Sequence, residues 1–204
     1  MTSAGGAAHW RIGAQLGGRI ADLNVASALY DKKQGRPRPG IFSGRFPATL
    51  LELLKLEDHA LDYTGNLVTW LKKLSEDEVQ TIGAEGQPIA WPPEECTFDA
   101  PLRPGKLITL ARNYHEHVAE HGLTHTGTVP SASIKASSSL TGPYHDIVCP
   151  AVERELDYET ELAVVIGKRC KNVPQRDAYD VVAGYTVLSD IVARQVLRSA
   201  CCQR

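Results

Sequence analysis

An acidic entrance to an apolar strand is the feature that most constrains this chain. The segment LDYETELAVVIGKRC (156–170) begins with Asp157, Glu159 and Glu161 and then turns into the apolar run AVVIG. Side chains alternate faces along a strand, so Glu159 and Glu161 point to the same side. Two like charges held side by side repel unless a cation lies between them or water dissolves them. The apolar run favours the cation, because it predicts a strand that is buried on both faces.

A third carboxylate, Asp190, follows the apolar stretch AGYTVLS. It joins Glu159 and Glu161 if the two strands are neighbours. Three carboxylates with no nearby cysteine suit a hard divalent cation such as Mg²⁺ or Mn²⁺ that keeps positions open for water and substrate. The alternative is that the two glutamates line the solvated face of an edge strand, and the E-x-E spacing alone favours that interpretation.

The segment NYHEHVAEHG (113–122) carries two further patterns. His117 and Glu120 are three residues apart and would share a face of a short helix, where the carboxylate can orient the imidazole as a general base. An isolated H-x-x-E is more often a polar surface segment. HVAEH, from His117 to His121, also matches an inverted zinc-protease pattern. We treat that match as coincidental, because it is three letters deep and no downstream helix offers an obvious third ligand.

Charge and composition exclude several partner classes. The 204 residues carry a formal net charge of −2, which gives no reason to expect nucleic acid or an anionic membrane as partner. No apolar run approaches the ~20 residues that cross a bilayer, and the N-terminus does not show the pattern of a secretory signal. Five cysteines without a CxxC spacing predict reduced thiols. We expect a cytoplasmic protein.

Two regions differ in character. Residues 1–100 predict a small α+β domain, with a hairpin at Gly17-Gly18, a helix near Val25–Lys33 and two leucine-rich helices within 48–74. A proline-containing passage, 85–106, predicts a connector.

Residues 101–204 predict a β-rich region with few long helices. KLITLARNY predicts a strand that leads into the short helix of His117, and Gly122 ends that helix. SASIKASSSLTGP (131–143) predicts a serine-rich loop. The acidic-entrance strand follows, and a last strand ends near Asp190.

Four segments in this order carry a resemblance to the fumarylacetoacetate hydrolase family: KLITLARNYHEHVAE, SIKASSSLTGP, DYETELAVVIGKRCKNV and AYDVVAGYTVLSDIVAR. Together they extend from about Leu102 to Arg194 and are highly specific. The chain resembles bacterial isomerase and acylpyruvase-type members, whose variable leading domain the first hundred residues resemble weakly. The resemblance implies an α+β fold, in which a small N-terminal domain precedes a mixed β-roll.

The resemblance also implies a site and a chemistry. Glu159, Glu161 and Asp190 would bind Mg²⁺, or Mn²⁺ or Ca²⁺ in its place. The metal would hold a 2-oxo acid or 1,3-diketo acid and stabilise an enolate, with C–C bond cleavage as the expected outcome and isomerisation or decarboxylation as close alternatives.

Four further residues receive roles from the resemblance. His117 and Glu120 correspond to the family's pair for water activation. Lys135 and Arg194 would offer positive charge to substrate oxygens, and Arg194 can hold a carboxylate in a fork. The family is commonly homodimeric, so we expect a homodimer.

The match weakens toward the end of the chain. Around the third ligand the family usually reads N-D-x-S/T-A-R-D-x-Q, whereas this chain reads SDIVARQVLRS. Family members normally continue for roughly another small domain. We therefore expect a β-roll that is incomplete at its C-terminal end, with open sheet edges. The alternative function is that of a catalytically inactive, truncated member that acts, if at all, by association with an intact subunit.

Overall fold

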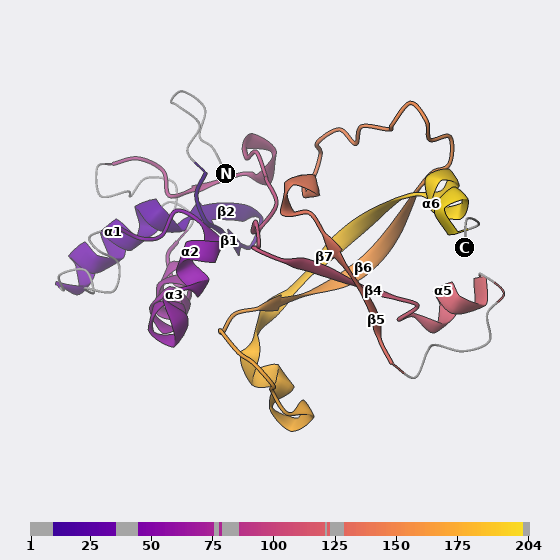
Figure 1. Ribbon diagram of the computed structural model, residues 1–204. Helices are drawn as coiled ribbons and strands as arrows, with labels where there is room; N and C mark the ends of the chain where they lie inside the picture. The colour runs from indigo at the N-terminus through magenta and orange to yellow at the C-terminus, as the bar shows by residue number, and fades with distance from the viewer. Residues whose placement is uncertain are drawn as a thin grey trace.

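The computed structural model describes residues 10–35, 45–75, 78, 86–120, 122 and 129–201. Helices lie beside three small antiparallel sheets, with the strand orders β1-β2-β3, β4-β5 and β6-β7 (Figure 1). The predicted α+β class is confirmed.

The first sheet is built on the predicted hairpin. β1 (Gly13–Leu16) and β2 (Arg19–Asp22) pair with Leu16 opposite Arg19, so Gly17 and Gly18 form a two-residue turn. Gly17 has a φ of 55°, in the left-handed region that glycine adopts without a steric cost. β3 (Ala90–Trp91) adds a third strand beside β2. This part of 85–106 is therefore sheet and not the expected connector, because Ile89-Ala90 is apolar and pairs with the open edge of β2.

The helices of the first half have strong end signals. α1 (Leu23–Gln34) begins at Asp22, whose Oδ1 accepts from the backbone N–H groups of Asn24 and Val25, and it ends at Gly35 with a φ of 61°. A short 3₁₀ turn, η2 (Pro93–Glu95), follows β3.

The leucine-rich segment forms two helices, as predicted. α2 (Leu50–Leu54) begins at a capping box of Thr49 and Glu52, and α3 (Glu57–Leu71) follows it. The main buried apolar cluster of the described residues joins these helices to the first sheet, and its members all lie between positions 21 and 90: Ala21, Leu23, Ala26, Phe46, Leu53, Ala60, Leu67, Leu71, Ile89 and Ala90.

The second half begins with a hairpin-like pair. β4 (Leu107–Ala111) runs antiparallel to β5 (Ser131–Lys135), with Leu107 opposite Lys135. The prediction of a loop over 131–143 is thus wrong for its first five residues, because backbone pairing with β4 requires no apolar side chains. A 3₁₀ turn, η3 (Ser137–Ser139), follows β5. Between the two strands lies the predicted helix, α5 (His115–Glu120), followed by Gly122 with a φ of 69°.

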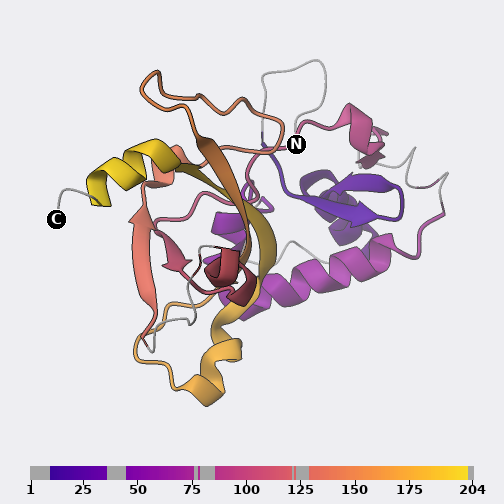
Figure 2. The same cartoon turned by 90° about the vertical axis from the view of Figure 1, so that its right-hand side faces the viewer.

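The longest strands form a two-stranded ribbon. β6 (Leu156–Ile166) pairs with β7 (Val182–Ala193), and the 3₁₀ helix η4 (Gln175–Val181) lies in their connection. β7 continues past Asp190, so that residue lies within the strand and not at its end. α6 (Arg194–Cys201) follows directly. Figure 2 shows β4 and β5 alongside this ribbon.

One face of the ribbon is exposed. Its large apolar side chains, which we call the apolar face, are each at least half exposed in this chain: Tyr158, Leu162, Val164, Ile166, Tyr185 and Val187. The expectation that AVVIG is buried on both faces is therefore wrong for the chain alone. The alternating exposure along β6 means that only the opposite face, which carries the carboxylates, is partly covered.

The core gives a first prediction. Leu67 in α3 is fully buried, and its replacement by alanine leaves a cavity that adjacent helices only partly close. We expect Leu67→Ala to lower the free energy of unfolding by about 2–5 kcal/mol, as measured by urea denaturation. Leu61→Ala on the same helix is the matched control, because Leu61 is 36% exposed. Equal losses in both variants would contradict the placement of the core.

Candidate metal centre

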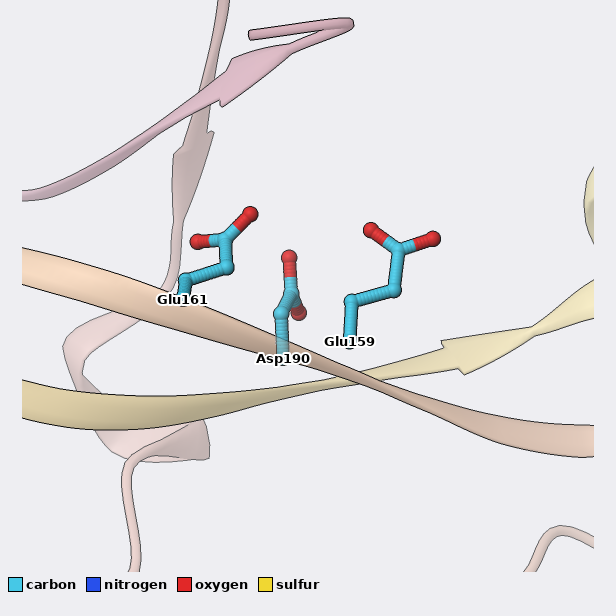
Figure 3. A group of neighbouring side chains, drawn as sticks. All are labelled: Glu159, Glu161 and Asp190. Atoms are coloured by element: carbon cyan, nitrogen blue, oxygen red, sulfur yellow. The ribbon is translucent and has the colours of Figure 1, made fainter. Parts of the chain in front are cut away.

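Three carboxylates converge on one face of the β6–β7 ribbon. Glu159 lies directly opposite Asp190 in the antiparallel register, and Glu161 is two residues further along β6 on the same face. The three residues each offer a carboxylate oxygen, and these oxygens lie within 4.8 Å of one another. Figure 3 shows all three side chains rising from the same side of the ribbon. They are half-buried, with 23% of the Glu159 side chain and 13% of the Asp190 side chain exposed.

Cationic side chains approach this triad from outside the ribbon. Lys135, at the end of β5, donates through Nζ to Asp190 Oδ1 at 2.8 Å. Arg194, the first residue of α6, donates through Nη2 to Glu159 Oε1 at 2.6 Å and through Nε to Asp157 Oδ2 at 3.0 Å. The structure therefore brings both cations that the resemblance assigned to substrate binding onto the carboxylates themselves.

The helix α5 places a histidine next to the triad. His117 Nε2 lies 3.9 Å from Glu159 Oε1. The Tyr114 hydroxyl accepts a hydrogen bond from the backbone N–H of Leu162 at 2.9 Å, which ties the start of α5 to β6. Glu120 lies on the same helix and is exposed. The use of Glu120 to orient His117 stays a prediction, and His121 of the zinc-protease pattern lies outside the described residues.

Burial and neighbouring charges shift the pKa values of Glu161 and Arg194. The pKa of Glu161 is raised, first by burial of the carboxyl group and then by the negative charges of Asp190 and Glu159, against which Lys135 and His117 act weakly. Among the ion pairs of the described residues, none involves Glu161. The pKa of Arg194 is also raised: burial would lower it, but Asp157 and Glu159 more than compensate. The triad thus lacks one positive charge near Glu161.

The residue that positions α6 is Glu153, which no pattern in the sequence singles out. The buried carboxylate of Glu153 accepts from the backbone N–H groups of Gln195 and Val196 in the first turn of α6. It also accepts from the N–H groups of Arg154 and Glu155 beside it. Burial alone would raise the pKa of Glu153, but these hydrogen bonds hold it below the usual value. A contact across more than 40 residues leaves no spacing signal in a single sequence.

The triad fits a hard divalent cation. Its donors are all oxygens, they converge from two paired strands, and one of them, on Glu161, has a raised pKa that a nearby positive charge would lower. Mg²⁺ and Mn²⁺ prefer this donor set. The observation that supports the fit is the geometry of the three side chains, not their acidity alone.

Comparison with known proteins supports the family resemblance. Residues 106–203 match the family model described as fumarylacetoacetate (FAA) hydrolase C-terminal. The mitochondrial oxaloacetate tautomerase Fahd2a of Rattus norvegicus is 42% identical over 190 residues, which cover 91% of this chain and 49% of the relative. The mitochondrial oxaloacetate tautomerase FAHD2A of Homo sapiens is 43% identical over 107 residues, covering 50% of this chain and 33% of the relative.

A solved structure agrees with these relatives. The structure of maleylpyruvate hydrolase from Sphingobium sp. SYK-6, in complex with manganese(II) ion and pyruvate, superposes with a TM-score of 0.58. The two chains are 28% identical, over 90% of this chain and 56% of that one. The predicted resemblance to the fumarylacetoacetate hydrolase family is therefore confirmed over residues 106–203. The chain spans half or less of the length of the curated relatives named here.

Two observations concern the location of the protein. In the part of the chain that the structure describes, no helix combines the length and apolar character that a membrane span requires. The prediction of a cytoplasmic protein is not confirmed, since two relatives are named as mitochondrial.

The raised pKa of Glu161 predicts a pH dependence of stability. The metal-free fold binds the Glu161 proton more tightly than the unfolded chain does, so this group lowers stability as pH rises from the usual glutamate pKa through the raised one. In EDTA we expect Glu161→Gln to be more stable than the parent chain at neutral pH, with the difference vanishing below the usual pKa. Urea denaturation between pH 4 and 8 measures the free energy of unfolding of the variant and of the parent chain. A variant that is less stable at neutral pH would contradict the uncompensated charge.

Proposed function

We propose that this chain carries the metal-binding part of a divalent-metal-dependent enzyme that acts on 2-oxo acids or 1,3-diketo acids, with C–C bond cleavage as the reaction. The convergence of Glu159, Glu161 and Asp190 supports this proposal most strongly. Two relatives support the substrate class: one is named as an oxaloacetate tautomerase, and a maleylpyruvate hydrolase was solved with manganese and pyruvate. Mg²⁺ or Mn²⁺ is the proposed ion. When bound, it supplies Lewis-acid stabilisation of the enolate charge that develops on substrate oxygens.

The residues around the triad would perform the other steps. His117, within 4 Å of Glu159, would take a proton from the water that attacks the distal carbonyl, and Glu120 would support it as a base. Lys135 and Arg194 would bind anionic oxygens of the substrate, with the planar guanidinium suited to a carboxylate. Because the side chains of Arg194 and Asp190 are mostly buried, these contacts would form in a partly desolvated site where charge interactions are strong.

The metal proposal is tested by Mn²⁺ binding and by turnover. We expect Glu159→Gln to weaken Mn²⁺ binding by at least about tenfold, because an amide oxygen replaces a charged ligand. Binding is followed by the electron paramagnetic resonance signal of free Mn²⁺, and turnover is followed with acylpyruvates and oxaloacetate. Glu155→Gln is the matched control, since Glu155 is exposed and pairs with Arg198 outside the triad. Equal effects in both variants, or no Mn²⁺ binding by the parent chain, would overturn the proposal.

The second candidate function is association with another chain of the family, and the exposed apolar face favours it. Soluble monomers rarely expose large contiguous apolar patches, and such patches mark interaction sites. We propose a homodimer, or a pairing with another subunit of the family, in which this face is covered.

Association gives its own prediction. The chain should self-associate in a concentration-dependent manner in sedimentation velocity, and Leu162→Asp should shift the distribution toward the monomer, because it places a charge on the apolar face. Thr69→Asp introduces the same charge at an exposed position of α3, outside the apolar face, and should leave the distribution unchanged. A monomeric parent chain would exclude the homodimer.

A further inference from the structure

Two of the three triad carboxylates are already neutralised by cations of the chain. Arg194 donates to Glu159 at 2.6 Å and Lys135 donates to Asp190 at 2.8 Å. Both distances are those of strong charge-assisted hydrogen bonds. All four side chains are at least two-thirds buried, so these pairs are screened less than ion pairs on the surface.

A divalent cation and these side chains require the same carboxylates. We propose that metal loading proceeds by charge exchange: the ion displaces Arg194 from Glu159 and Lys135 from Asp190, and the two released cations then bind the anionic groups of the substrate. The inference rests on the proposed metal site and concerns the order and the coupling of binding. The metal binds first, and it creates the capacity to bind the anion.

Charge counting gives the reason. With Asp157, which shares Arg194 with Glu159, four carboxylates, one lysine and one arginine carry a net charge of −2, and adding a divalent ion changes it to 0. The metal-free site therefore repels a substrate anion, and the loaded site no longer does. Direct coordination of the substrate by the metal adds to this coupling but does not involve the two side chains.

The surroundings of Arg194 suit such an exchange. Its Nε is held by Asp157, which lies outside the triad, while its Nη2 contacts Glu159. Glu153 fixes the backbone just after it through Gln195 and Val196. When Nη2 leaves Glu159, the guanidinium stays anchored beside the site and presents a free edge to an anion. Arg194 is thus both a competitor of the metal and a receptor for the anion.

This dual role predicts effects of opposite sign. Arg194→Ala should tighten Mn²⁺ binding by about tenfold, because no counter-ion has to be displaced. The same change should weaken the binding of oxalate to the Mn²⁺-saturated protein by about tenfold, because the anion loses its partner. If Arg194 only maintained the fold, its replacement would weaken both Mn²⁺ binding and oxalate binding.

The test is a pair of titrations on the full chain: Mn²⁺ by electron paramagnetic resonance, and oxalate on the Mn²⁺-saturated protein by calorimetry. Arg198→Ala is the matched control. It removes the same charge from the same helix, but Arg198 pairs with Glu155 away from the triad, and we expect changes below about twofold. Arg194→Lys is the second variant, for use if Arg194→Ala does not fold. It keeps the charge but cannot contact Asp157 and Glu159 as a fork, and it should show both shifts at smaller size.

The possible outcomes distinguish a failure of the charge exchange from a failure of the metal-site proposal. Tighter Mn²⁺ and weaker oxalate binding in the Arg194 variants, with Arg198→Ala unchanged, is the expected result. Unchanged or weaker Mn²⁺ binding in both Arg194 variants would overturn the exchange and leave the metal site standing. Tighter Mn²⁺ with unchanged oxalate binding, or equal shifts in Arg198→Ala, would also overturn it. A parent chain that binds no Mn²⁺ would overturn the proposed function and the exchange together.

Discussion

Repulsion among three carboxylates on one face of a two-stranded ribbon is the constraint on which the second half of this protein depends. The pleat of β6 and β7 forces Glu159, Glu161 and Asp190 together, and partial burial makes their charges costly. Two neighbouring elements place a positive charge beside the triad: β5 ends at Lys135 and α6 begins at Arg194. One of these elements, β5, is distant in sequence, and the other, α6, follows β7 directly, but each places a cation on the triad.

The two halves of the chain are stabilised in different ways. The first half has a continuous apolar core, which α1, α2, α3 and the first sheet bury together. In the second half the described residues are held mainly by backbone pairing, the ion pairs of the triad and the hydrogen bonds of Glu153. Its apolar face remains open. Ligands that supply charge to the triad, or a chain that covers this face, should thus act on the stability of the second half more than on the first. The division into domains at residues 1–100 and 101–204 stays a prediction.

Local patterns carried most of what the sequence could predict. The alternation of side chains placed Glu159 and Glu161 on one face, the glycine pair gave the hairpin, and the Gly122 stop ended α5. Long-range contacts were missed. Lys135 was expected in a loop, because only the pairing with β4 makes its segment a strand. Glu153 gave no signal, since its partners lie over 40 residues away. The ion pairs of Arg194 and Lys135 were also missed, because the resemblance assigns those residues to a substrate.

The β6–β7 triad is proposed to hold one divalent cation, which displaces Arg194 and Lys135 from its carboxylates. A crystal structure of the protein soaked in Mn²⁺, with the ion located by its anomalous scattering, tests this most directly. We expect one strong peak bonded to Glu159, Glu161 and Asp190, with the guanidinium of Arg194 withdrawn from Glu159 and still held by Asp157. A triad without a peak, or a peak elsewhere with both ion pairs intact, would contradict it.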